Sequence, residues 1–184
     1  MTRAIWKYLA TALLLVVGCG TGGEPSNTNG PSSTSPPVLT TTTTPGQSVD
    51  VFFGVDGSVD CAEVQAFPRQ ILSDLDPIQG AFESLLAGPT QAESGATSWF
   101  SADTSDALRS VTLADGLLTV DLDDLSSVIS GASSSCGSAA LLAQLTATGF
   151  QFPEVQEIEF QFEGSCDDFF NFLQMECTVI GRPG

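Results

Sequence analysis

Hydrophobic and polar residues alternate most regularly over residues 156–163, which predicts a strand with one buried face and one solvent-exposed face. The same alternation lies on both sides of Asp115-Gly116 and predicts a hairpin of strands 108–114 and 117–122, because this dipeptide favours a tight turn. A nearly continuous apolar run over residues 49–55 predicts a strand inside a sheet. In the 156–163 strand the buried face carries Ile158, Phe160 and Phe162, and the exposed face carries Glu157, Glu159, Gln161 and Glu163.

Three segments, 77–87, 136–148 and about 167–175, have apolar residues at helical spacing. Asp76 and Pro77 favour the start of the first helix, and Gly88-Pro89 favours its end. The order strand, helix, hairpin, helix, strand, helix predicts an α+β fold, a mostly antiparallel sheet of about four strands with two or three helices packed on one face. The predicted inward-facing residues are Ile78, Phe82, Leu85, Leu86, Leu141, Leu142, Leu145, Phe169, Phe170 and Leu173.

The N-terminal segment has the pattern of an export signal over residues 1–18. Arg3 and Lys7 accompany an apolar stretch at 9–17, which is too short to span a bilayer. Val16-Val17-Gly18-Cys19 resembles the lipobox of bacterial lipoproteins. This resemblance implies cleavage before Cys19 and acylation of Cys19, with palmitate among the chains, which would anchor the protein to the extracytoplasmic face of the cell membrane. An ordinary secretory signal is the alternative.

Residues 19–48 then comprise the lipidated cysteine and a segment rich in Gly, Pro, Ser and Thr. Such a composition is too poor in apolar residues to form a core, so we expect a disordered tether. Residues 49–180 are enough for one domain.

The mature chain is strongly acidic. Once residues 1–18 are removed, Arg69, Arg109 and Arg182 remain against 22 Asp and Glu residues, a formal charge of −19. This charge disfavours binding to nucleic acid. Solubility is the simplest interpretation of the charge, and a cationic partner or divalent ions are the alternatives.

Four further cysteines, Cys61, Cys136, Cys166 and Cys177, are expected to form two disulfides in an oxidising compartment. Zinc is disfavoured because no Cys-x-x-Cys spacing and no histidine are present. We predict the pairs Cys136–Cys166 and Cys61–Cys177, because a crossover helix begins near the end of the strand that follows it. A bond between Cys166 and Cys177, closing the last helix on itself, is the alternative.

The absence of histidine, and of lysine after residue 18, excludes Ser-His-Asp and Ser-Lys catalysis. Ser133–Ser135 is therefore interpreted as a polar turn and helix cap. Pairs of carboxylates remain as candidates for glycoside hydrolysis, although strand ends and exposed strand faces commonly carry such residues. We predict no catalytic residue. If the protein were a glycoside hydrolase, the candidate catalytic carboxylates would be Asp121, Asp123, Asp124, Glu157 and Glu159.

Asp56, Asp60 and Glu63 follow the first strand and could bind calcium weakly, although a plain surface loop accounts for them better. We therefore predict no metal and no cofactor. Trp99 and Phe100 are adjacent aromatics in a segment rich in Ser and Thr. They are either an anchor for a binding partner or a lid folded over the core.

Several short motifs follow one another along the chain: Leu85-Leu86-Ala87-Gly88-Pro89-Thr90 with Glu93, Ser110-Val111, Asp115-Gly116, Val120-Asp121-Leu122, Gln144-Leu145-Thr146-Ala147-Thr148, Phe152-Pro153 with Val155, and Phe160 to Gly164. In this order they resemble the GerMN domain of sporulation and spore-germination proteins. A further segment, Cys136–Leu142, and the tail through Phe172-Leu173-Gln174 and Cys177 resemble the variant found in actinobacterial lipoproteins.

The resemblance implies a binding module of the cell envelope with no established catalytic residues. We therefore predict a membrane-anchored lipoprotein that binds an envelope protein or a peptidoglycan component, in sporulation or germination, with Trp99 and Phe100 as contact residues. The alternative function is a small carboxylate-dependent glycoside hydrolase acting on the cell wall.

Overall fold

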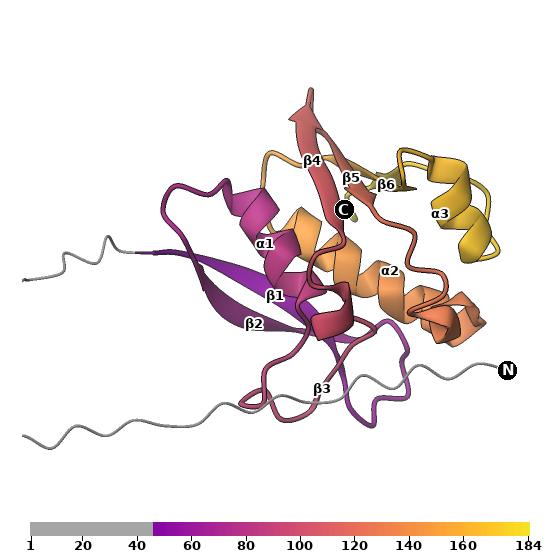
Figure 1. Cartoon of the computed structure of the whole chain (residues 1–184), viewed down its shortest axis with the longest axis horizontal. Coiled ribbons are helices and arrows are strands. Elements are labelled where there is room, and N and C mark those ends of the chain that lie inside the picture. Colours follow the sequence, from indigo (N-terminus) through magenta and orange to yellow (C-terminus); the bar gives the residue numbers. More distant parts are fainter. Residues whose placement is uncertain (1–45) are drawn as a thin grey trace, which may run out of the picture. The chain divides into compact units, whose positions relative to one another are not determined.

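The computed structural model describes residues 46–184, so Cys19, the predicted signal peptide and most of the predicted tether lie outside the described residues. The described chain forms a pair of sheets that enclose two helices (Figure 1). No helix of residues 46–184 has the length and apolar character needed to cross a membrane.

The first sheet has the order β2-β1-β3, and all its pairs are antiparallel. β1 (Gln47–Val55) is the central strand. β2 (Val64–Ile71) pairs with β1 along most of its length, and β3 (Ala96–Thr97) pairs only with the last two residues of β1. The alternating pattern of β1 buries Val49, Val51 and Phe53 toward the helices.

The second sheet has the order β4-β5-β6-β7. β4 (Leu108–Ala114) and β5 (Leu117–Leu122) form the predicted hairpin, and Asp115 and Gly116 have the positive φ angles of its turn, 52° and 87°. β6 (Glu157–Phe162) runs parallel to β5, and β7 (Ile180–Gly181) pairs antiparallel with the first two residues of β6. Two parallel strands need a long crossover, and here the crossover contains α2.

Helices α1 (Pro77–Leu86) and α2 (Ser135–Phe150) lie between the two sheets, whereas α3 (Cys166–Phe172) packs against β6 (Figure 1). The side chain of Asp76 accepts hydrogen bonds from the backbone N–H groups of Ile78 and Gln79, and Ser134 accepts one from Gly137, so both interior helices have capped starts. One large core cluster joins these layers, and Val49, Ile71 and Ala81 form a second, smaller cluster. The largest fully buried side chains are Phe53, Phe82, Phe160, Phe169, Phe170, Leu85, Leu86, Leu118, Leu122, Leu141, Leu145 and Ile158.

The α+β class is confirmed, but the layering is richer than one four-stranded sheet with helices on one face. β2 was not predicted, because Pro68 interrupts its pattern. Proline is tolerated here because β2 is an edge strand, which has a neighbouring strand on one side only and can therefore lack one backbone N–H donor. Short 3₁₀ helices at Ala102–Thr104 and Ser130–Ser133 complete the described elements.

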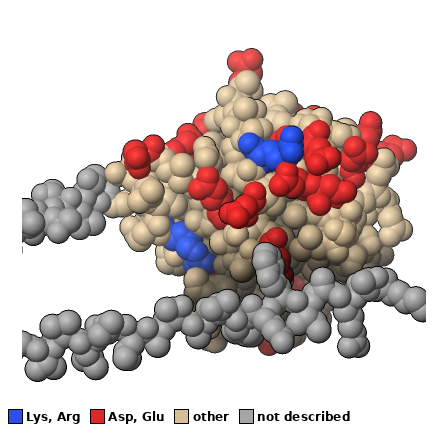
Figure 2. Space-filling view, in the orientation of Figure 1, with Lys and Arg blue, Asp and Glu red and all other residues tan. Residues whose placement is uncertain are grey.

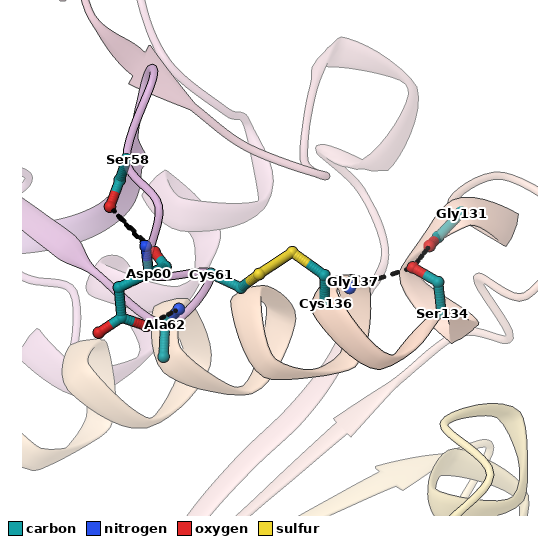
Figure 3. The surroundings of a disulfide bond; sticks show 8 residues. All are labelled: Ser58, Asp60, Cys61, Ala62, Gly131, Ser134, Cys136 and Gly137. Atoms are coloured by element: carbon teal, nitrogen blue, oxygen red, sulfur yellow. Dashed lines mark hydrogen bonds between the residues drawn. A yellow bond between two sulfur atoms is a disulfide. The ribbon is translucent and has the colours of Figure 1, made fainter.

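The predicted disulfide pairing is wrong. Cys61 bonds to Cys136 (Figure 3), with a Cα–Cα distance of 5.4 Å. Cys166 bonds to Cys177, with a Cα–Cα distance of 5.5 Å. The parallel crossover was expected correctly, and the start of α2 does approach α3, since Ser138 Oγ donates to the carbonyl of Leu173 at 3.4 Å. The segment between β5 and α2 nevertheless directs Cys136 toward the β1–β2 turn. Gln174, with a φ of 61°, reverses the chain after α3 and returns Cys177 to Cys166.

Candidate functional site

Trp99 and Phe100, the predicted contact residues, point into different surroundings. Phe100 is 2% exposed and belongs to the core, so it is folded over the core and is not exposed to a partner. A side chain at Gly88 would lie 2.4 Å from the Phe100 carbonyl oxygen, so this segment crosses the end of α1 at a position only glycine fits. Trp99 is half-buried against the core and keeps part of its ring at the surface. Only Trp99 is therefore available to a partner.

A shallow hollow of about 210 Å³ lies beside Trp99 and is lined by Thr97, Ser98, Ala140 and Gln144. Gln144 is 1% exposed, and its Oε1 accepts a hydrogen bond of 2.6 Å from Ser98 Oγ. The same Ser98 Oγ accepts one from the Phe100 N–H. These bonds hold the loop against α2, so the indole borders a hollow that also carries hydroxyl and amide groups.

The carboxylates considered for catalysis are mainly structural. Asp121 Oδ2 lies 3.2 Å from Arg109 Nε, and Asp121 Oδ1 accepts a 2.7 Å hydrogen bond from the Gly164 N–H. Asp123 also pairs with Arg109, at 3.1 Å, and these two hydrogen bonds raise the pKa of that guanidinium. Both oxygens of Asp121 therefore hold β4, β5 and the β6–α3 turn together.

Glu157 and Glu159 lie on the outer face of β6, as predicted, and Glu159 accepts a hydrogen bond from Gln161. Asp124 follows β5 and accepts a 2.8 Å hydrogen bond from the Ser126 N–H. This bond holds the pKa of Asp124 below its ordinary value, whereas the general acid of a glycosidase needs a raised pKa.

The calcium candidates lie in the turn between β1 and β2, where Figure 3 shows Asp60. Asp60 Oδ1 accepts a hydrogen bond from the Ala62 N–H, and Glu63 accepts one from Ser58, so both bind within the turn itself. Within residues 46–184, no three cysteine or acidic side chains converge as metal ligands would.

A second hollow, of about 390 Å³, was not predicted from the sequence. Its walls come from the β6–α3 turn, α3 and the segment after β5, and it is lined by Asp124, Ser126, Phe162, Glu163, Asp168, Asn171 and Phe172. We call it the acidic groove. Figure 2 shows red acidic side chains gathered beside a blue basic side chain on the part of the domain that carries β4, β5, β6 and α3 in Figure 1. The sequence shows the acidic pattern at Glu163-Gly164 and Asp167-Asp168. It does not show that Asp124 lies close to these residues, because that depends on the pairing of β5 with β6.

The fold described here is that of a GerMN domain. The tandem GerMN domains of the sporulation protein GerM from Bacillus subtilis match with a TM-score of 0.52 and 22% identity, over 76% of this chain and 45% of that one. This chain thus spans less than half of the length of that structure. A lipoprotein candidate from Clostridium perfringens matches with a TM-score of 0.42 and 17% identity, over 75% of this chain and 89% of that one.

Residues 50–167 match the Germane family, described as sporulation and spore germination. Because the match covers well over half of the chain, the chain belongs to this family, and the predicted GerMN-type domain is confirmed. No curated protein matches the chain significantly.

Proposed function

We propose that this chain is a lipid-anchored extracytoplasmic protein whose Germane domain binds an envelope protein or a peptidoglycan component without catalysing a reaction. The observation that carries the proposal is the hollow beside Trp99, where a partly exposed indole borders hydroxyl and amide groups. Aromatic side chains of this kind supply much of the energy of an interface. The family description supports a role in sporulation or germination.

Anchoring rests on the lipobox-like sequence at Cys19. Cys19→Ala should leave the protein as an unprocessed precursor or release it from the membrane fraction, because the variant lacks the thiol that carries the lipid. Replacing Cys166 and Cys177 together by alanine is the matched control and should leave fractionation unchanged. A Cys19→Ala protein that is processed normally and stays in the membrane pellet would disprove the anchor.

Binding at Trp99 is tested by placing a photo-reactive phenylalanine at this position in the full chain in intact cells. The control places the same group at Leu72, which is 72% exposed and lies after β2. A product formed at position 99 and absent at position 72 supports the proposal, and digestion of the product by a muramidase separates peptidoglycan from protein. Equal products at both positions, or none at 99, would contradict it.

The absence of catalysis is tested by dye release from labelled cell walls. We expect no release, because Asp121 uses both oxygens in structural bonds and the pKa of Asp124 is lowered rather than raised. Release that disappears in Asp121→Asn or Glu157→Gln, with the fold retained, would favour the hydrolase.

A further inference from the structure

The acidic groove combines an aromatic floor with a carboxylate rim. Phe162 is 2% exposed, and its ring centroid lies 5.8 Å from that of the half-buried Phe172. Asp124, Glu163 and Asp168 are exposed around these rings. A hollow of about 390 Å³ with an apolar base and several negative groups has the shape and charge to receive a cationic side chain rather than an uncharged one.

The rim carboxylates have no cationic partner within residues 46–184, because all three arginines there are engaged elsewhere. Arg69 pairs with Glu93, and Arg109 pairs with Asp121 and Asp123. Arg182 donates to the backbone carbonyls of Phe150, the last residue of α2, and of Val155 in the following loop, at 2.7 and 2.9 Å. Charge balance at the groove therefore has to come from another molecule or from solvent ions.

The groove is also held rigidly in place. Glu163 has a φ of 50° and Gly164 a φ of 82°, and this tight turn is fixed by hydrogen bonds from Glu163 N–H to the Leu122 carbonyl and from Gly164 N–H to Asp121. The Cys166–Cys177 disulfide ties the start of α3 to the segment that follows it. A preformed site loses less conformational entropy on binding than a mobile one does.

We propose that the acidic groove binds a basic segment of a partner protein, with an arginine side chain over Phe172 and its guanidinium among Asp124, Glu163 and Asp168. The proposal rests on the function proposed above and names the chemistry of one partner. Arginine is the favoured cation because its planar group stacks on aromatic rings and pairs bidentately with carboxylates, which an ammonium group does not do.

Two simpler roles exist for acidic residues in this region, and both predict a result different from that expected for a binding groove. Asp167 and Asp168 lie in the first turn of α3, where their negative charge interacts favourably with the helix dipole. A high negative charge keeps a protein soluble wherever the charges lie. Neither role depends on Phe172, and neither distinguishes the groove from other acidic surface.

The test uses the full mature chain in detergent and a fluorescently labelled peptide of alternating arginine and glycine, with binding followed by fluorescence anisotropy. The groove variant is Asp124→Asn/Glu163→Gln/Asp168→Asn. The matched control is Asp56→Asn/Asp74→Asn/Glu154→Gln, which removes the same charge from exposed residues on three other loops. The same peptide with lysine in place of arginine, and the variant Phe172→Leu, test the aromatic floor.

We expect the groove variant to bind the arginine peptide more weakly by about twofold to fivefold for each carboxylate removed, and the control to lose much less. Binding should weaken as salt is added. The arginine peptide should bind better than the lysine peptide, and Phe172→Leu should abolish this preference while circular dichroism shows a retained fold. Equal losses in the groove and control variants, no discrimination between the peptides, or a groove saturated by calcium in place of peptide would overturn the proposal.

These outcomes are separable from failure of the function proposed above. If the groove proposal fails, the photo-reactive group at position 99 still reports whether the domain binds a partner in cells. If that group captures nothing while the arginine peptide prefers the groove, the site at Trp99 is wrong and the acidic groove stands.

Discussion

Cys61 and Cys136, 75 residues apart in sequence, join the β1–β2 turn to the first turn of α2 (Figure 3). The two segments are ordered by their own hydrogen bonds at this point. Asp60 accepts from Ala62 in the turn, and Ser134 accepts from Gly137 at the helix start. The disulfide therefore connects two locally formed structures that belong to different layers of the domain.

Proteolysis of the purified protein without reductant should yield one peptide pair that contains Cys61 and Cys136 and one that contains Cys166 and Cys177. The reason is geometric, since only these sulfur atoms are brought together by the fold of residues 46–184. Mass spectrometry of the peptides before and after reduction checks the pairing. A peptide linking Cys136 to Cys166 would show that the β5–α2 segment follows a different path.

Removal of the two disulfides should destabilise the protein unequally. In the chain-entropy model, closing a loop of 75 residues contributes about 4 to 5 kcal/mol, and closing one of 11 residues contributes about 3 kcal/mol. Replacing Cys61 and Cys136 by alanine should thus lower the free energy of unfolding more than replacing Cys166 and Cys177. Urea unfolding of both double variants checks this order, and the reverse order would contradict the entropic account.

Glu93→Gln should destabilise the protein at neutral pH and much less in acid. Hydrogen bonds from the Arg69 guanidinium, one of 2.8 Å, and one from the Thr90 N–H lower the pKa of Glu93 below its ordinary value of 4.5. The stabilisation is present above the pKa of the unfolded chain and is lost as the pH falls through the lowered, folded-state pKa. We expect a loss of about 1 to 2 kcal/mol at pH 7.

Urea unfolding of wild type and Glu93→Gln at a series of pH values from neutral to strongly acidic measures this difference. The matched control is Glu154→Gln, because Glu154 is exposed. The control should stay within about 0.5 kcal/mol of wild type. A Glu93→Gln difference that remains constant into acid would contradict the assigned pair.

Gly131→Ala should displace the indole of Trp99, because the new Cβ would lie 2.9 Å from ring carbons Cη2 and Cζ3. Trp99 is the single tryptophan after residue 18, so intrinsic fluorescence of the processed protein reports on it alone. Quenching by acrylamide should increase in Gly131→Ala. Gly181→Ala, whose Cβ would meet nothing within 4 Å, should leave quenching unchanged. Unchanged quenching in both variants would show that Trp99 does not rest on Gly131.

Most of the local structure could be read from the sequence. The hairpin around Asp115-Gly116 matches residue for residue, since a turn that needs positive φ at two successive positions tolerates few dipeptides. Asp76, Pro77 and Gly88 bound α1 closely, and the alternation of β6 places Ile158 and Phe160 inside. Caps, turns and one-sided burial act over a few residues, so the local sequence determines them.

The tertiary structure alone decided what joins distant segments. The presence of Pro68 kept β2 from being predicted, because this strand forms by pairing with β1 and not through a hydrophobic pattern of its own. Trp99 and Phe100 are adjacent in sequence, yet one borders a surface hollow and the other lies in the core. The disulfide partners and the approach of Asp124 to Asp168 depend on the path of loops. Sequence patterns report the face on which a residue lies, whereas its partner across space depends on how all the layers pack together.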